Sequence, residues 1–135
     1  MKNTERGFTL IEIILAIAAL ALTSGLIARL FIAGADVNAK ARDIDAASQA
    51  AVSAIERIKA LDSPEGLAEA SLPRVYDADW RETDTDGRFR LTVAVLSEER
   101  PGGTMARITA AVSGADGGDP LVLYSAAKYF PNQRG

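Results

Sequence analysis

Two residue types on which much protein chemistry depends are missing from this sequence. It contains no cysteine, which excludes a disulfide framework, a thiolate metal site, a cysteine nucleophile and cysteine lipidation. It also contains no histidine, which removes the commonest general base, any Ser-His-Asp arrangement and most zinc chemistry. We therefore expect a protein that is not an enzyme and that uses no cofactor or metal ion.

An excess of basic charge is also missing, and so is early proline. The formal net charge of −3 argues against a strongly basic nucleic-acid binder, so no nucleic acid is expected as a partner. The first proline is Pro64, and no proline interrupts a helix before it. With 135 residues, the chain can hold one compact domain plus a membrane segment.

What the sequence does contain is a long apolar run near its start. The run begins at Phe8, and residues 13–28 carry no charged side chain. At 1.5 Å per residue, a helix over residues 8–35 is about 42 Å long, which exceeds the ~30 Å hydrocarbon core of a bilayer. Such a helix can span a membrane with tilt, or span it and continue into water.

Two ordinary interpretations of this run are a cleavable secretory signal and a plain transmembrane anchor. A signal fits the basic start, with Ala33-Gly34-Ala35 as a small-residue cleavage site. That site lies far beyond the usual length of a signal's apolar region, and Arg29 intervenes. Neither interpretation explains Glu12, which lies near the start of the apolar run.

Glu12 is an acid in apolar surroundings. An ionised carboxylate there costs at least a few kcal/mol unless it is paired, which makes Glu12 a functional candidate. Arg29 lies about 25 Å further along a helix and cannot be the partner within one chain. We therefore expect the counter-charge to come from another molecule, or the carboxyl group to stay protonated.

The residues around Glu12 resemble a known family. Gly7-Phe8-Thr9-Leu10-Ile11-Glu12 is similar to the prepilin cleavage and methylation motif of type IV pilins and type II secretion pseudopilins. The shared features are a short basic leader, Gly followed by Phe, a carboxylate five residues in, and an uninterrupted apolar run. The resemblance covers residues 6–35, and it implies a structural subunit of a filament.

The resemblance implies specific partners and processing. A prepilin peptidase cuts between Gly7 and Phe8 and methylates the new amino group of Phe8. Glu12 then neutralises the N-terminus of a neighbouring subunit, which is favourable because an unpaired carboxylate and an unpaired ammonium are each costly in a low dielectric. The other partners are further pilin or pseudopilin subunits, through the N-terminal helix, and membrane lipid. The implied location is the bacterial inner membrane, with a single pass and a periplasmic C-terminal domain.

Departures from the family pattern narrow the choice within it. Many members have a proline later in the N-terminal helix, where this chain has Arg29, and many major pilins have a disulfide-closed C-terminal region. Both departures favour a minor pseudopilin, with the I-type most similar, or a minor pilin of a type IV or DNA-uptake pilus. Glu12 argues against the tip-forming minor pseudopilin. From another class, a membrane-anchored extracytoplasmic binding domain remains an alternative.

The residues after the apolar run predict a second helical stretch and then a small sheet. Residues 36–61 continue the helix, and Asp62-Ser63-Pro64 ends it. Its apolar positions recur at steps of three and four and form one stripe: Val37, Ala41, Ile44, Ala47, Ala51, Ile55 and Ile58. Because no other amphipathic element is available, we expect this stripe to cover one face of the sheet.

Alternating patterns predict the strands of that sheet. Residues 62–86 are expected to be loop-like, with a short strand around residues 73–80. Three further strands follow over residues 88–97, 105–113 and 121–130, joined by Gly-rich turns that include residues 98–103. The fold class is therefore α+β, a long N-terminal helix on an antiparallel meander of three to four strands. The expected domains are a leader (1–7), an assembly helix (8–35), its amphipathic continuation (36–61) and a β-sheet head (62–135).

Candidate chemistry in the head is weak. The acidic run over residues 77–86 resembles a calcium-binding loop of the EF-hand type. If such a loop starts at Glu82, its last ligand position is Val93, whose side chain cannot bind a metal. The Gly-rich segment 113–118 lacks a phosphate-binding lysine, and its pattern predicts a hairpin turn. Three aromatic residues are expected to seal the small core rather than stack a ligand: Tyr76, Trp80 and Phe130.

Overall fold

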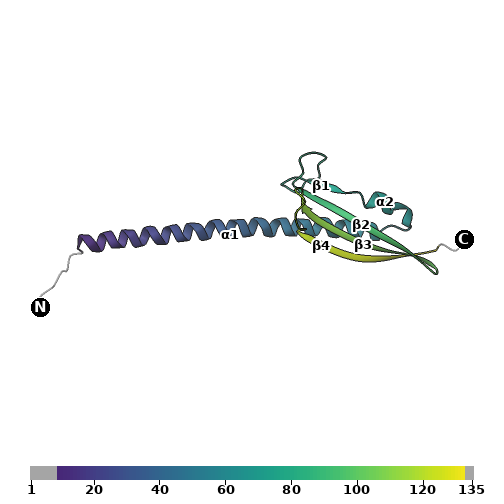
Figure 1. Ribbon diagram of the computed structural model, residues 1–135, viewed down its shortest axis with the longest axis horizontal. Coiled ribbons are helices and arrows are strands. Elements are labelled where there is room, and N and C mark those ends of the chain that lie inside the picture. The colour runs from purple at the N-terminus through teal and green to yellow at the C-terminus, as the bar shows by residue number, and fades with distance from the viewer. Residues whose placement is uncertain (1–8, 133–135) are drawn as a thin grey trace. The chain divides into compact units, whose positions relative to one another are not determined.

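The computed structural model describes residues 9–132 as a long helix followed by a small antiparallel sheet (Figure 1). The chain divides into two compact units, with the boundary between Ala41 and Arg42 inside the long helix. We refer to described residues 9–41 as the N-terminal unit and 42–132 as the C-terminal unit. The elements, in order, are α1 (Leu10–Lys59), the 3-10 turn η1 (Pro64–Gly66), α2 (Leu67–Ala70), β1 (Arg74–Tyr76), β2 (Phe89–Arg100), β3 (Gly103–Gly114) and β4 (Val122–Pro131).

In the N-terminal unit, large apolar side chains lie on every side of α1. Its large apolar side chains are all exposed, and Leu22 and Phe31 are each 76% exposed. The Thr23 hydroxyl donates to the carbonyl oxygens of Ala19 and Leu20, so this polar group is satisfied inside the helix, as a lipid environment requires. By length and composition, α1 is the one helix in the described residues that could cross a membrane.

In the C-terminal unit, four antiparallel strands form one sheet in the order β1-β2-β3-β4. The register pairs Leu91 with Val112 and Ile108 with Ala126, so the apolar positions of the strands share one face. The β2–β3 turn contains only Pro101 and Gly102, and Gly102 has a φ of 96°, which favours glycine. The predicted α+β meander is therefore confirmed.

The core forms where residues 47–58 of α1 pack on this sheet. Ala47, Ala51 and Ala54 are at most 1% exposed, and their small side chains let the sheet approach the helix closely. The other buried apolar residues of the core come from α1, α2 and the strands: Ile55, Ile58, Leu67, Phe89, Leu91, Val93, Ala106, Ile108, Ala110, Val112 and Phe130. Burial of this cluster is the main source of stability for the C-terminal unit.

The predicted apolar stripe is confirmed only over its last part. Ala47, Ala51, Ile55 and Ile58 are buried, but Val37 is 68% exposed, and Ala41 and Ile44 are also exposed. The stripe was wrong at its first three positions, whose side chains are exposed. Ala54 was missing from the prediction, although it lies on the same helix face.

Several predicted boundaries also need correction. The strands β2 and β3 run to Arg100 and from Gly103, so the predicted turn over residues 98–103 is too long. The strand predicted around residues 73–80 stops at Tyr76. The segment expected to be loop-like contains α2, whose Leu67 is buried in the core. Hydrophobic patterning misses such a short helix because it offers one apolar anchor and no period.

Candidate functional site

Glu12 lies in the first turn of α1 and is held there by hydrogen bonds from Thr9. The Thr9 backbone N–H donates to Glu12 Oε2 over 2.8 Å, and the Thr9 hydroxyl donates to the same oxygen over 3.2 Å. The Thr9 carbonyl accepts from the N–H groups of Glu12 and Ile13. This is the carboxylate half of a capping box, in which an acid at the third helical position satisfies the N–H group before the helix.

The capping contact adds to the sequence argument about Glu12. That argument considered opposite charges, and it expected the counter-charge to come from another molecule or the carboxyl group to stay protonated. Neutral donors within the chain do reach the carboxylate, and a Thr-x-x-Glu pattern over residues 9–12 could have predicted them. Both donors are uncharged, so these hydrogen bonds hold the carboxyl group at the helix start without supplying a counter-charge from residues 9–132.

Gly7 and Phe8, the predicted processing positions, lie outside the described residues. The side chain of Arg29 is described, and it borders a shallow depression of about 330 Å³ on α1, together with Ala21, Leu22, Gly25 and Leu26. Glu12 and Arg29 are not brought together: within residues 9–132, the hydrogen bonds to the Glu12 carboxylate come from Thr9.

In the C-terminal unit, the acidic segment of residues 77–86 is a structured loop. Asp77 Oδ1 accepts from the N–H groups of Asp79 and Arg81, each over 2.9 Å. The Glu82 carboxylate pairs with Arg74 over 2.8 Å. Their oxygens are thus engaged with backbone and guanidinium donors, and the described residues contain no group of three acidic side chains placed to hold a metal ion.

The aromatic side chains of this region pack on the core, as predicted. Trp80 stacks on Phe89 with ring centroids 4.2 Å apart, and Tyr76 is tilted against Trp80 at 5.8 Å. The Trp80 indole N–H donates to Asp43 Oδ1 over 3.2 Å, and Asp43 also faces the Arg88 guanidinium at 3.9 Å. Sequence reasoning missed Asp43 because no local pattern indicates which helix residue accepts a hydrogen bond from an indole 37 residues away.

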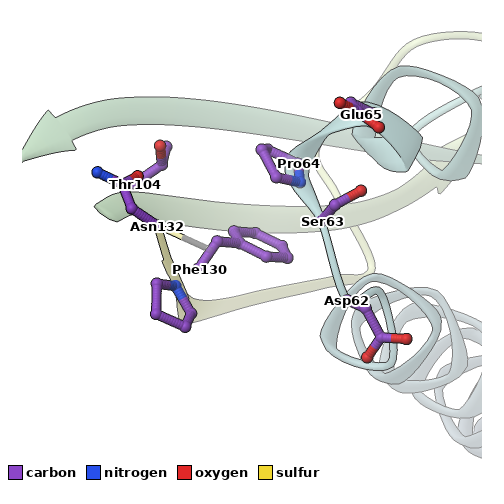
Figure 2. Close-up of a pocket in the computed structure, with 8 residues that line it drawn as sticks. Asp62, Ser63, Pro64, Glu65, Thr104, Phe130 and Asn132 are labelled. Atoms are coloured by element: carbon purple, nitrogen blue, oxygen red, sulfur yellow. The ribbon is translucent and has the colours of Figure 1, made fainter. Parts of the chain in front are cut away.

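A polar depression of about 430 Å³ lies beside the C-terminal end of α1 (Figure 2). Figure 2 shows the carboxylates of Asp62 and Glu65 pointing apart, while the ring of Phe130 lies between the two sides of the depression. Because the acidic groups do not converge, this arrangement offers neither an oxygen cage for a cation nor a pair of carboxylates for acid–base chemistry.

Beside this depression, Lys128 of β4 caps α1. Its ammonium group donates to the carbonyl oxygen of Lys59, one of the groups that a helix end leaves unpaired, and to that of Leu61, two residues beyond the helix. The same ammonium lies 5.2 Å from the ring centroid of Phe130. This contact joins the last turn of the helix to the last strand of the sheet, and its role is structural.

Comparison with known proteins gives one match. Residues 2–28 match the family model of the prokaryotic N-terminal methylation motif. No curated protein and no solved structure matches the chain. The match covers Thr9, Glu12 and the apolar run as far as residue 28, and it does not extend into the C-terminal unit.

Proposed function

We propose that this chain is a type IV pilin-like protein and, within that class, a minor pseudopilin, a structural subunit of a type II secretion pseudopilus. The observation that carries the proposal is the position of Glu12. Its carboxylate accepts hydrogen bonds from Thr9, and it lies at the start of a helix segment whose large apolar side chains are all exposed. An isolated anchor gains nothing from this charge, whereas a filament of packed helices can pair it with a neighbour.

In this proposal the chain is made with a leader, residues 1–7, that a prepilin peptidase removes between Gly7 and Phe8. The same enzyme methylates the Phe8 amino group. Glu12 of one subunit then lies against the N-terminus of another, and residues 8–35 pack against neighbouring helices and lipid. The Thr9 hydrogen bonds hold the carboxylate at the helix start and so prepare it for that contact.

In this proposal the chain lies in the bacterial inner membrane, crosses it once and has its C-terminal domain in the periplasm. Arg29 then reaches the outer headgroups with its long side chain. Residues 36–61 continue into the domain, and residues 62–135 form the β-sheet head. No enzymatic activity is proposed, because the methylation-motif family is structural and the sequence lacks histidine and cysteine.

Two alternatives remain open to experiment. A minor pilin of a type IV or DNA-uptake pilus has the same N-terminal motif, and the missing proline and cysteine favour a minor subunit of either system. A membrane-anchored binding domain needs no processing at Gly7. The mature N-terminus separates this last class from the first two.

Mass spectrometry of the protein purified from its own membrane tests the processing. We expect the mature chain to begin at an N-methylated Phe8. A chain that keeps Met1, or one cleaved near Ala35, contradicts the proposal. Co-purification of the mature chain with secretion components or with pilus components then decides between pseudopilin and pilin.

Three substitutions separate the two roles of Glu12. If assembly needs the negative charge, Glu12→Gln and Glu12→Ala both block incorporation into filaments while leader cleavage continues. Glutamine keeps an oxygen that can cap the helix, so normal incorporation of Glu12→Gln contradicts the pairing role and leaves only capping. Thr9→Ala removes the hydroxyl and keeps the carboxylate, and we expect it to reduce incorporation only partly. Immunoblots of sheared filaments and of processed precursor provide the two readouts.

A further inference from the structure

A groove of about 340 Å³ runs between α1 and the β1 edge of the sheet, wholly inside the C-terminal unit. On the helix side it is lined by one stripe at steps of three and four: Ala46, Gln49, Ala50, Ser53 and Arg57. On the other side it is lined by Arg74 and Tyr76 of β1 and by Trp80. This stripe is a different face of α1 from the one that packs on the sheet, which carries Ala47, Ala51, Ile55 and Ile58.

Two positively charged side chains, Arg57 and Arg74, line the groove. Within residues 9–132, Arg57 forms no ion pair, whereas Arg74 pairs with Glu82. The Tyr76 phenol lies near the side chains of Arg57, Arg74 and Glu82. Burial and Glu82 raise the pKa of the phenol, while Arg74 and Arg57 lower it. The phenol therefore stays protonated at neutral pH and keeps a hydroxyl that can donate a hydrogen bond.

The loop that places Trp80 beside the groove has a strained backbone at that residue. Trp80 has a φ of 61°, in the left-handed region that a bulky side chain rarely adopts. The loop is held by Asp77, whose carboxylate accepts from Asp79 and Arg81 and whose carbonyl accepts from Trp80. With the stack on Phe89 and the bond to Asp43, these contacts fix the indole before any ligand arrives.

We propose that this groove binds a carboxylate side chain presented by a neighbouring protein subunit, with Arg57 as its main partner and Tyr76 as a second donor. Arginine, tyrosine and tryptophan are the residues that most often dominate the affinity of protein interfaces. The small side chains of Ala46 and Ala50 give the incoming segment room beside the helix.

The surrounding charges define the incoming segment further. Asp77, Asp79 and Glu82 lie in the loop that carries Trp80, so a polyanion such as a nucleic acid meets repulsion beside the groove. A protein segment with one acidic residue, followed or preceded by basic residues, matches both the groove and its rim. The proposal uses the filament subunit role only as the source of this neighbour.

Site-specific photo-crosslinking in cells that assemble the native system tests the groove. A photoreactive residue replaces Ser53 of the full-length chain, and mass spectrometry identifies the crosslinked peptide. We expect one segment of another subunit, or of a second copy, with an Asp or Glu within a few residues of the crosslink. A crosslink only to lipid, or to a segment without acidic residues, overturns the proposal.

A charge series at position 57 supplies the matched controls. Arg57→Glu is expected to lower the crosslink yield about tenfold, as the loss of a dominant interface residue does, whereas Arg57→Lys keeps most of it. Arg107→Glu makes the same change of charge on the sheet face that points away from α1, and we expect it to leave the yield unchanged. Equal yields for Arg57→Glu and Arg57→Lys overturn the proposal.

The same cells separate this inference from the proposed function. Leader cleavage and filament incorporation are measured beside the crosslink. If the charge-dependent crosslink forms while the chain is neither cleaved at Gly7 nor incorporated, the groove is supported and the filament role fails. If cleavage and incorporation are normal and no charge-dependent crosslink forms, the filament role stands and the groove inference fails.

Discussion

The two parts of α1 have the same backbone conformation and opposite arrangements of apolar side chains. Before the boundary at Ala41, large apolar residues face every direction, and all of them are exposed. After it, buried residues keep to one face, and three of the five are alanines. The difference shows that forming a helix does not by itself determine what a segment packs against. The distribution of apolar residues around the helix determines whether it packs on a sheet or needs another apolar environment.

The largest expected effect compares the same substitution in the two parts. Ile108→Ala removes a fully buried side chain from β3 and is expected to cost about 2–5 kcal/mol of unfolding free energy. Ile17→Ala removes an equal volume from an exposed position of α1, so the stability of the C-terminal unit should change by less than about 0.5 kcal/mol. Denaturant unfolding of the full-length chain in detergent micelles measures both. Equal losses mean that the two parts are not independent.

A second comparison concerns the end of α1. Lys128→Met removes the ammonium group that caps Lys59 and Leu61 and is expected to destabilise the C-terminal unit by about 1–2 kcal/mol. Lys40→Met, on an exposed turn of the same helix, serves as the control, with an expected change within about 0.5 kcal/mol. A Lys128→Met variant as stable as the unsubstituted chain shows that water replaces the cap.

A smaller effect is expected just after the boundary. Asp43→Ala removes the acceptor of the Trp80 indole and the carboxylate that faces Arg88, at an expected cost of about 1 kcal/mol. Trp80 is the only tryptophan, so its fluorescence reports the change directly. We expect a shifted emission maximum for Asp43→Ala and none for Asp45→Ala, whose side chain is exposed. Identical spectra for both variants refute the anchoring role of Asp43.

The smallest effect is a pH dependence confined to the C-terminal unit. Burial, aided by Glu82, raises the pKa of Tyr76 above its ordinary value of 10.0. The folded state therefore favours the neutral phenol, and its stabilisation is complete below pH 10 and declines as the pH rises toward the raised value. Tyr76→Phe should therefore lose less stability than the unsubstituted chain as the pH rises above 10. Parallel losses assign the pH dependence to other groups.

Much of the fold could be predicted because its signals are local. Phe89, Leu91 and Val93 alternate along one strand, and Ala106, Ile108, Ala110 and Val112 along the next, so their common buried face follows from the period of a strand. The candidate site was predictable at Glu12 for the same reason, since an acid within an apolar run is visible without any structure. The capping partner Thr9 was equally local, but a search limited to opposite charges overlooked it.

The remaining features join residues that are distant in the sequence, and no local pattern marks them. Lys128 reaches the end of α1, Asp43 reaches Trp80, and Arg57 lies across a groove from Arg74. Each of these contacts depends on how the sheet is laid on the helix. The short helix α2 belongs here too, because only the packing of Leu67 on the core gives it a reason to form.

By itself, the sequence determined the helix, the strand alternation and the acidic residue at the start of an apolar segment. These are properties of neighbouring residues, fixed by the 3.6-residue and two-residue periods of the backbone. Only the tertiary structure decided where the apolar stripe of α1 stops being buried and which charged groups meet across the C-terminal unit. The physical reason is that burial and pairing depend on the extent of the opposing surface, and the sheet buries side chains of this helix only over residues 47–58.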